Sequence, residues 1–190
     1  MKKYMFHDSI SIMEKEDRRL LLHCCCGPCS TASIERLLEE GITPVLFFSN
    51  SNIHPSSEFD KRYGELLKVA RHYGLEVIRE EQDHDAWRNA VKGHEDDREG
   101  GERCSLCFRY NLLRAAAKAR ELGIPSFATT LTVSRFKNSA RIFAQGEDLD
   151  GFEPIDFKKR DGFNRSLRLS KELDLYRQDY CGCEFSMRKG

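Results

Sequence analysis

Short apolar segments alternate with amphipathic helical segments along most of the chain, and this alternation limits the folds that the chain can adopt. The apolar runs are too short for helices and are bounded by charged or turn-forming residues, as buried strands are. The predicted strands span 18–23, 43–50, 75–80 and 124–130, and the predicted helices span 29–41, 56–74, 104–123, 134–149 and 166–180. Such alternation is typical of parallel βαβ units, in which binding sites form beyond the carboxyl ends of the strands. The sequence therefore predicts one α/β domain over residues 1–190, with helices flanking a parallel sheet.

Eight cysteines gather in three clusters, at residues 24–29, 104–107 and 181–183. A chain of 190 residues buries enough surface to fold without disulfides. No apolar run reaches the length of a membrane span, and the N-terminal residues lack the apolar core of an export signal, so we expect a cytoplasmic protein with no membrane partner. In that reducing compartment, clustered thiols favour metal binding or redox chemistry over cross-linking.

The first cluster lies in the stretch HCCCGPC, which directly follows the first predicted strand. Cys26 and Cys29 have the spacing of a thioredoxin-type redox turn. Cys24 and Cys25 come directly before them, however, and extra thiols are unusual in such a turn. The stretch therefore suits either a redox disulfide or a metal site at the edge of the sheet.

The other two clusters leave more than one chemistry open. Cys104 and Cys107 lie three residues apart at the start of a predicted helix, so their side chains share one face near backbone N–H groups that favour thiolates. Together with the first cluster, they could hold an iron–sulfur cluster or zinc, or act as redox thiols. Cys181 and Cys183 are separated by one glycine, which suits a reducible disulfide or two further metal ligands.

The charges are unevenly distributed although the net charge is zero, from 31 basic and 31 acidic residues. Residues 1–100 carry 14 Lys/Arg and 19 Asp/Glu, whereas residues 101–190 carry 17 and 12. The second half, including a basic C-terminal segment at about 151–190 that carries the CGC motif, is therefore the better candidate for an anionic partner. Basic runs are usually solvated faces, so charge alone leaves phosphate binding open.

Five sequence blocks resemble those of a known family. His23-x-Cys25-Cys26-Gly-Pro-Cys29 resembles the family signature HxCCAPC, and four further blocks follow in the same order. They are NSNIHPSSEFDKR (50–62), RCSLCFRYNL (103–112), TTLTVSRFKN (129–138) and FNRSLRLSKELDLYRQDYCGC (163–183). The family is the cobalamin-independent epoxyqueuosine reductase of the QueH type, and the resemblance covers nearly the whole chain.

The resemblance implies a Rossmann-like fold of the adenine nucleotide alpha hydrolase (HUP) type. It implies an oxidoreductase that removes the epoxide of epoxyqueuosine at the tRNA wobble position and leaves the alkene of queuosine. The implied cofactor is a [4Fe-4S] cluster with a second, mononuclear iron beside it. On matching positions, the cluster ligands are Cys25, Cys26, Cys104 and Cys107, and Cys29 helps to hold the second iron.

The resemblance also implies that Cys181 and Cys183 form a redox-active disulfide that takes part in catalysis. The chain departs from the family signature at its variable position, where Cys24 makes three consecutive thiols. A pairing of Cys24 with Cys25 therefore stays open as an alternative to Cys25 with Cys26.

The implied partners are a tRNA with a GUN anticodon that carries epoxyqueuosine, and an electron donor that the sequence does not identify. We expect basic residues of the second half to bind the tRNA phosphates and one aromatic ring to contact a base. These residues are Arg135, Lys137, Lys158, Lys159, Arg165 and Phe163. Asp8, Asp60 and His54 are further candidates for acids or ligands, although a surface or core role is more common for such residues.

Two alternative functions come from other classes. A metal-dependent tRNA thiolase of the PP-loop type shares the predicted fold, but its first loop should read Ser-Gly-Gly-x-Asp-Ser where this chain has CCCGPC. A zinc-stabilised RNA-binding module would use the same thiols without catalysis, and it predicts a colourless protein with one zinc ion.

Overall fold

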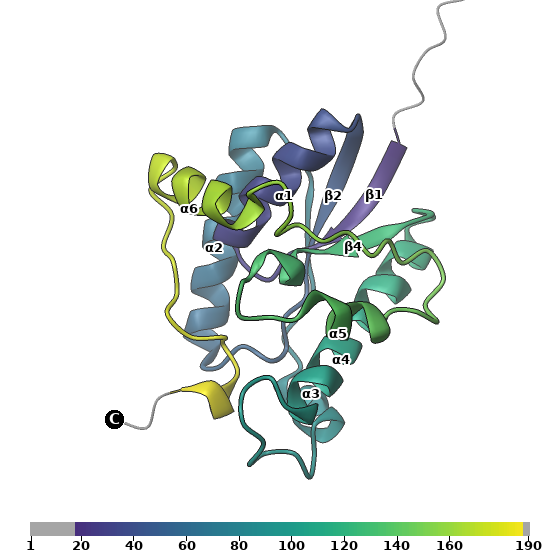
Figure 1. Cartoon of the computed structure of the whole chain (residues 1–190), viewed down its shortest axis with the longest axis vertical. Helices are drawn as coiled ribbons and strands as arrows, with labels where there is room; N and C mark the ends of the chain where they lie inside the picture. The colour runs from purple at the N-terminus through teal and green to yellow at the C-terminus, as the bar shows by residue number, and fades with distance from the viewer. Residues whose placement is uncertain (1–17, 188–190) are drawn as a thin grey trace, which may run out of the picture.

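The computed structural model describes residues 18–187 of the chain. A four-stranded parallel sheet lies at its centre, with the strand order β3-β2-β1-β4 (Figure 1). The strands are β1 (Arg18–His23), β2 (Ile42–Phe48), β3 (Val77–Arg79) and β4 (Phe127–Thr129). Leu22 of β1 pairs with Leu46 of β2 on one side and with Ala128 of β4 on the other. The prediction of a parallel α/β sheet in a single domain is confirmed.

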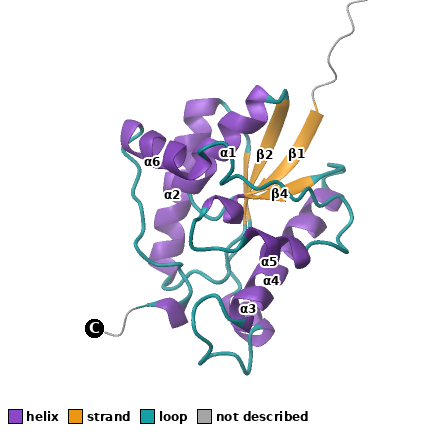
Figure 2. Cartoon of the chain, viewed as in Figure 1, coloured by secondary structure: helices purple, strands orange, loops and turns teal. Residues whose placement is uncertain are grey.

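Helices cover both faces of this sheet (Figure 2). They are α1 (Gly27–Glu39), α2 (Ser56–Tyr73), α3 (His84–Ala90), α4 (Glu102–Glu121), α5 (Ser139–Ala144) and α6 (Gly162–Glu172), with the 3₁₀ segments η1 (Thr130–Val133) and η2 (Glu184–Ser186). Successive residues of β1 point to opposite faces, so Leu20 and Leu22 pack with α1 and α2, whereas Leu21 packs with α4. Within residues 18–187, none of the helices combines the length and the apolar character needed to cross a lipid bilayer.

Four predicted elements have clearly different bounds in the structure. The helix predicted at 134–149 is α5, which starts only at Ser139 because the Asn138 side chain accepts a hydrogen bond from the Arg141 N–H at 3.2 Å and caps the helix there. The helix predicted at 166–180 is α6, which starts earlier and ends at Glu172. Asp174 then has a φ of 48°, outside the helical region, so the chain leaves the helix. The strands predicted at 75–80 and 124–130 are reduced to β3 and β4, which have three residues each.

Residues 173–183, named here the C-terminal strap, continue without regular secondary structure after α6. The sequence did not predict the α-helix α3, whose first turn is capped by the Asp83 side chain, which accepts from the Ala86 N–H at 2.9 Å. Both departures lie downstream of the first two βα units. The long first strands and helices follow the expected pattern, because each has a complete apolar face of its own.

Candidate active site

The carboxyl ends of β1, β2 and β4 meet at one edge of the sheet, where the fully buried His23 joins them. Its Nε2 lies 3.0 Å from the carbonyl oxygen of Ser49, and because a carbonyl only accepts, Nε2 carries the proton. Its Nδ1 accepts a hydrogen bond from the Thr129 hydroxyl at 2.9 Å. Burial lowers the pKa of His23 to about 4, so the ring stays neutral. His23 therefore fixes the point at which the cysteine loop leaves the sheet.

Three thiols converge in the thiol loop, which we define as residues 24–29. The Sγ atoms of Cys25, Cys26 and Cys29 all lie within 4.8 Å of one another. Within residues 18–187, they form the one group of three or more His, Cys, Asp or Glu side chains compact enough to hold a metal ion. Cys24 lies outside this group, because its Sγ donates to the Leu22 carbonyl at 3.2 Å and is packed in the core. This geometry favours Cys25 and Cys26 as the adjacent pair.

Gly27 and Pro28 shape the thiol loop through helix packing. A Cβ atom at Gly27 would lie 2.7 Å from the backbone carbonyl of Glu65 in α2, closer than an ordinary contact allows. Pro28 occupies the first turn of α1, where its missing N–H removes no helical hydrogen bond. The Gly-Pro pair therefore lets α1 lie directly against α2 and places Cys29 in the first turn of α1.

Cys26 is the thiol of this group that is best prepared to become a thiolate. Hydrogen bonds from Cys25 and Cys29 lower the pKa of Cys26 well below its usual value. Gln178 of the C-terminal strap adds a hydrogen bond from its Nε2 to the Cys26 Sγ at 3.3 Å. The same contact with Cys26 raises the pKa of Cys25 to about 12. Because metals bind thiolates, Cys26 gives the loop a ligand that is ready for a cation.

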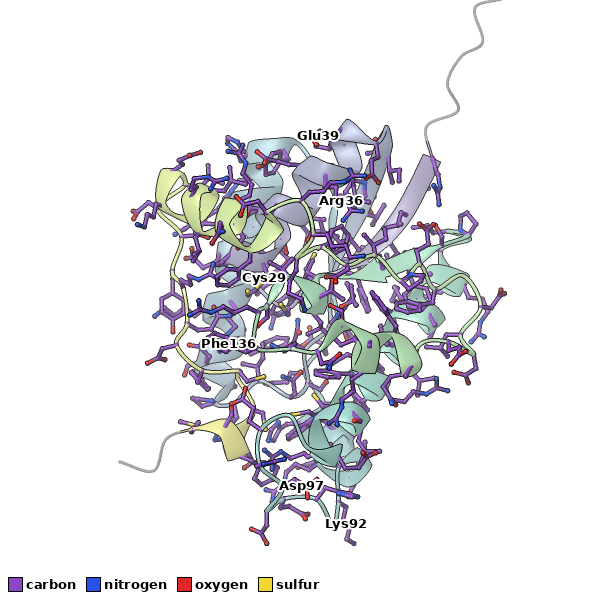
Figure 3. The ribbon with its side chains drawn as sticks, viewed as in Figure 1. Cys29, Arg36, Glu39, Lys92, Asp97 and Phe136 are labelled. Atoms are coloured by element: carbon purple, nitrogen blue, oxygen red, sulfur yellow. The ribbon has the colours of Figure 1, made fainter. Side chains whose placement is uncertain are left out.

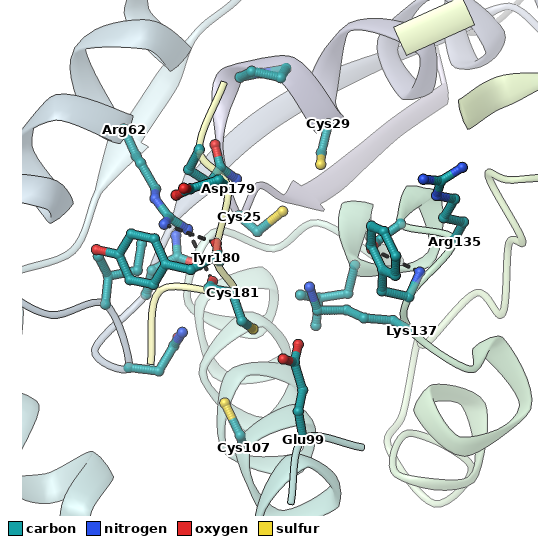
Figure 4. Close-up of a pocket in the computed structure, with 18 of the residues that line it drawn as sticks. Cys25, Cys29, Arg62, Glu99, Cys107, Arg135, Lys137, Asp179, Tyr180 and Cys181 are labelled. Carbon is teal, nitrogen blue, oxygen red and sulfur yellow. Dashed lines mark hydrogen bonds between the residues drawn. The ribbon is translucent and has the colours of Figure 1, made fainter. Parts of the chain in front are cut away.

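The thiol loop opens into a cavity of about 700 Å³, a volume in the range of small-molecule sites. Its wall contains thiols from all three sequence clusters: Cys25 and Cys29, Cys107 of α4, and Cys181 of the strap. Figure 3 shows Cys29 near the middle of the molecule, close to Phe136 in that view. Figure 4 shows Cys181 between the thiol loop and Cys107. The structure thus brings segments far apart in sequence to one cavity.

Cys104 and Cys107 lie near the start of α4, as the sequence predicts. Cys107 lines the cavity, and the Asn111 Nδ2 lies 3.7 Å from its Sγ. Cys104 accepts a hydrogen bond from the Gly100 N–H at 3.2 Å and packs against the same apolar cluster as Cys25. Burial raises the pKa of Cys104 and of Cys107, so each is held as a thiol until a cation approaches.

Cys181 and Cys183 have different surroundings. Each of the eight cysteines, all within the described residues, carries a free thiol. Cys181 lines the cavity, whereas Cys183 packs against the buried side chains of Trp87 and Val91. Burial raises the pKa of Cys183 to about 11. The redox-active disulfide between the two cysteines stays a prediction.

Arg62 of α2 anchors the C-terminal strap, a role that the sequence analysis missed. Its side chain is 2% exposed, and its Nε donates to the Glu58 carboxylate at 2.7 Å. Its Nη1 donates to the Cys181 carbonyl at 3.0 Å, which places that cysteine beside the cavity. The sequence signal was the spacing of Glu58 and Arg62, four residues apart on a helix, but surface ion pairs have the same spacing. The Gln178 contact with the thiol loop gave no sequence signal.

Lys137 brings a positive charge to the thiols. Its side chain is half-buried and points toward Cys181 in Figure 4. Burial by itself lowers the pKa of Lys137, but the nearby thiolates, Cys181 foremost, raise it above the ordinary value. The carboxylates of Glu99 and Asp179 also line the cavity. The cavity therefore combines soft metal ligands with a permanent cation and with acidic groups.

The remaining predicted contacts with tRNA divide into two groups. Arg135 and Phe163 line the cavity, and Lys158 lines a shallower hollow next to it. Arg165 instead forms a two-pronged ion pair with Glu35, at 2.8 and 2.9 Å, so its charge is already balanced. The expectation that Arg165 binds a phosphate is therefore not supported. Lys159 is exposed but lies outside both hollows.

Two of the candidate acids and ligands, Asp60 and His54, do not line the cavity. Asp60 is exposed and pairs with Arg79 at 3.0 Å. The His54 ring lies against the His84 ring, with 5.3 Å between the centroids. Asp8 lies outside the described residues. Asp60 and His54 thus have the surface and packing roles that are usual for such residues.

The fold and the site define a class: a parallel α/β protein whose sheet edge carries a cysteine-lined cavity suited to metal and redox chemistry. The sequence model described as "Epoxyqueuosine reductase QueH" matches residues 20–189. The chain belongs to the QueH family of epoxyqueuosine reductases and is an oxidoreductase. The family resemblance and the enzyme class predicted from the sequence are confirmed.

Curated relatives support this assignment over most of their length. Epoxyqueuosine reductase QueH of Streptococcus pyogenes is 37% identical over 190 residues, which cover 93% of this chain and 74% of the relative. The Acinetobacter baylyi protein is 38% identical, with 90% of this chain and 81% of the relative covered. The Thermotoga maritima protein is also 38% identical, with 88% and 90% covered.

A solved structure with the same fold is the U34-tRNA thiolase NcsA from Methanococcus maripaludis with its [4Fe-4S] cluster. Its TM-score to this chain is 0.50 at 12% sequence identity, and the match covers 90% of this chain and 62% of that chain. At this identity the likeness shows the fold alone. The predicted fold class is confirmed, and the alternative thiolase function gains no support from it.

Proposed function

We propose that the chain reduces the epoxide of epoxyqueuosine at the wobble position of a tRNA with a GUN anticodon. The observation that carries this proposal is the single cavity that gathers thiols from three distant segments around Lys137. A nucleoside-sized cavity with polar and cationic groups in its wall suits a base that is turned out of an RNA loop. Since tRNA is modified in the cytoplasm, we place the enzyme there.

The set of donors fits an iron–sulfur cluster. Thiolates from an adjacent pair and from a distant helix suit a [4Fe-4S] core, whose irons are set at separate corners. The buried Asn111 Oδ1 and Gln178 Oε1 have no hydrogen-bond partner within the described part of the chain, and both residues line the cavity. NcsA is a protein of this fold that holds such a cluster. The proposed cluster ligands are Cys25, Cys26, Cys104 and Cys107.

Cys29 remains in the thiol loop as a ligand for a second, mononuclear iron. Its Sγ is near those of Cys25 and Cys26 and also faces the cavity. When bound, the two groups would supply single electrons and a Lewis acid for the epoxide oxygen. The side chains around these two groups have three tasks: they bind the nucleoside, position the strap thiols and stabilise the charge on the leaving oxygen.

The electrons and atoms balance with one dithiol. The epoxide takes up two electrons and two protons, its two C–O bonds break, and the products are the alkene and one water molecule. The thiols of Cys181 and Cys183 lose two electrons and two protons and become a disulfide, which an external two-electron donor then reduces. Lys137 Nζ donates a hydrogen bond to the oxygen while negative charge builds up on it. Arg62 holds the Cys181 backbone in place during this step.

Replacement of both strap thiols tests the proposed reaction. C181S/C183S protein should keep its iron and sulfide but lose turnover, measured by mass spectrometry of nucleosides from epoxyqueuosine-containing tRNA. C24S is the matched control, because Cys24 lies outside the metal-binding group and serine keeps the hydrogen bond to Leu22. Full activity of the double variant would rule out the dithiol. A colourless protein with one zinc ion and no iron would instead favour the non-catalytic RNA-binding module.

Salt dependence tests the tRNA partner. The proposed phosphate contacts are Arg135, which lines the cavity, and Lys158, which lines the hollow beside it, because Lys137 is assigned to the epoxide oxygen. Each phosphate contact releases counterions, so the affinity for an anticodon stem-loop should fall steeply as salt rises. An affinity that stays constant between low and high salt would contradict this surface.

A further inference from the structure

Phe136 is the most exposed large apolar residue of the described chain, with 75% of its surface open to solvent. It lies between η1 and α5 and lines two hollows at once. One is the thiol-lined cavity of about 700 Å³, and the other is a shallower hollow of about 520 Å³. Arg135 and Lys137 line both hollows as well, and residues 135–137 are named here the ridge.

The backbone that presents this ring is held by several hydrogen bonds. Lys158 Nζ donates to the Lys137 carbonyl at 2.7 Å and to the Ser134 carbonyl at 3.3 Å. The Phe136 N–H donates to the Ser134 hydroxyl at 3.3 Å, and the Lys137 N–H to the Ser134 carbonyl at 3.2 Å. The exposure of the aromatic ring is thus a feature of an ordered turn.

A cation that no acid of the described chain neutralises lies against the exposed ring. The Arg135 guanidinium lies 4.9 Å from the centre of the Phe136 ring and 5.2 Å from that of Phe163. Within residues 18–187, Arg135 forms no ion pair. Arg177 lies over the Phe163 ring at 5.6 Å. Aromatic rings interleaved with free cations are typical of surfaces that bind single-stranded nucleic acid, where bases stack and phosphates are neutralised.

We propose that Phe136 stacks against the base of the RNA nucleotide next to the one that enters the cavity. This proposal rests on the proposed tRNA function. An RNA strand with its reactive base in the cavity must cross the ridge to reach the shallower hollow, and the neighbouring base then meets the exposed ring. The wall of that hollow has three cations, Arg135, Lys137 and Lys158, and one acid, Asp156. This excess of positive charge suits the phosphate between the two nucleotides.

Truncation of the ring gives the first test. We expect F136A protein to bind a fluorescein-labelled anticodon stem-loop about tenfold more weakly than the unsubstituted protein, the loss of one stacked base. The matched control is L113A, which removes an exposed apolar side chain of α4 outside both hollows. Its affinity should be unchanged. Equal affinities of F136A and unsubstituted protein would overturn the role of Phe136 and leave the tRNA function standing, whereas no binding by the unsubstituted protein would overturn both.

The second test asks which part of the RNA meets the ring. Two stem-loops are compared, one without the base before the wobble position and one without the base after it. For one of these two RNAs, F136A and unsubstituted protein should bind with equal affinity. If F136A weakens binding of every such RNA equally, the ring does not stack on a neighbouring base.

Fluorescence gives a direct readout of stacking. The one tryptophan of the chain, Trp87, is fully buried, so F136W protein adds an exposed reporter at the ridge. Saturation with the stem-loop should quench the added emission of F136W, because stacked bases quench indole, and should leave the emission of the unsubstituted protein nearly constant. Unchanged emission of F136W at saturation would contradict the proposal. If F136A instead changes self-association in sedimentation and not RNA binding, the ring belongs to a contact between copies of the chain, and the proposal is wrong.

Discussion

The thiol loop and the C-terminal strap both bring cysteines to the cavity, but the molecule holds them in different ways. The thiol loop leaves the central strand beside the buried His23 and continues into α1, which packs on α2 at Gly27. The strap has no regular secondary structure and depends on individual side chains such as Arg62 and Gln178. The thiol loop therefore belongs to the core of the fold. Cys181 of the strap is held by a long-range hydrogen bond, and Cys183 is packed against Trp87 and Val91 in a smaller cluster.

The largest expected effect comes from breaking the thiol loop. C25S protein should contain almost no iron after anaerobic reconstitution and should be inactive, because serine is a poor ligand for an iron–sulfur cluster. The C24S control should keep the iron content of the unsubstituted protein. Iron and sulfide analysis makes this comparison. Iron retained in C25S protein would show that Cys25 is not a ligand, and iron lost in C24S protein would show that the adjacent pair has been assigned in the wrong register.

A smaller effect should follow from releasing the strap. R62M leaves the Glu58 carboxylate buried without its cation, so the free energy of unfolding should fall by about 3 kcal/mol. We expect turnover to fall on the order of a hundredfold while the iron content stays normal. R71M is the matched control, since Arg71 lies on the same helix but is exposed.

The position of the strap in R62M protein is read from the rate at which iodoacetamide modifies Cys181, followed by peptide mass spectrometry. The rate should rise in R62M and stay constant in R71M. Normal turnover together with an unchanged alkylation rate would show that Arg62 does not position the strap.

The smallest effect should come from the hydrogen bond between Gln178 of the strap and Cys26 of the thiol loop. Q178A removes a single hydrogen bond to the Cys26 Sγ, which is worth about 1 kcal/mol. Turnover should fall by no more than about tenfold, and the iron content should not change. Chemical denaturation and the nucleoside assay measure both quantities. A complete loss of iron in Q178A would mean that the thiol loop depends on the strap, and would contradict the conclusion that the core of the fold alone holds the loop.

The same contrast explains how much the sequence could predict. The first strands and helices and the thiol loop are local patterns: an apolar run, a Gly-Pro start and a stripe of apolar residues determine them. Convergence of the clusters at one sheet edge follows from parallel topology. The place of Cys104 and Cys107 at the start of a helix could also be predicted, because their three-residue spacing is a local pattern that needs no distant partner.

The strap could not be predicted because its contacts are long-range. Arg62 and the Cys181 carbonyl are 119 residues apart, and Gln178 and Cys26 are 152 apart. The apolar pattern after α6 favoured a longer helix, but the left-handed Asp174 ends it. The ion pair of Arg165 with Glu35 is another long-range contact. It neutralises a cation that the sequence predicts to bind RNA.

A crystal structure of the anaerobically iron-loaded protein, with iron located by its anomalous scattering, tests the central claim most directly. We expect one [4Fe-4S] cluster in the cavity, bound by Cys25 and Cys26 on one side and by Cys104 and Cys107 on the other. Iron bound by the thiol loop alone, with both α4 cysteines out of reach of the metal, would contradict the account.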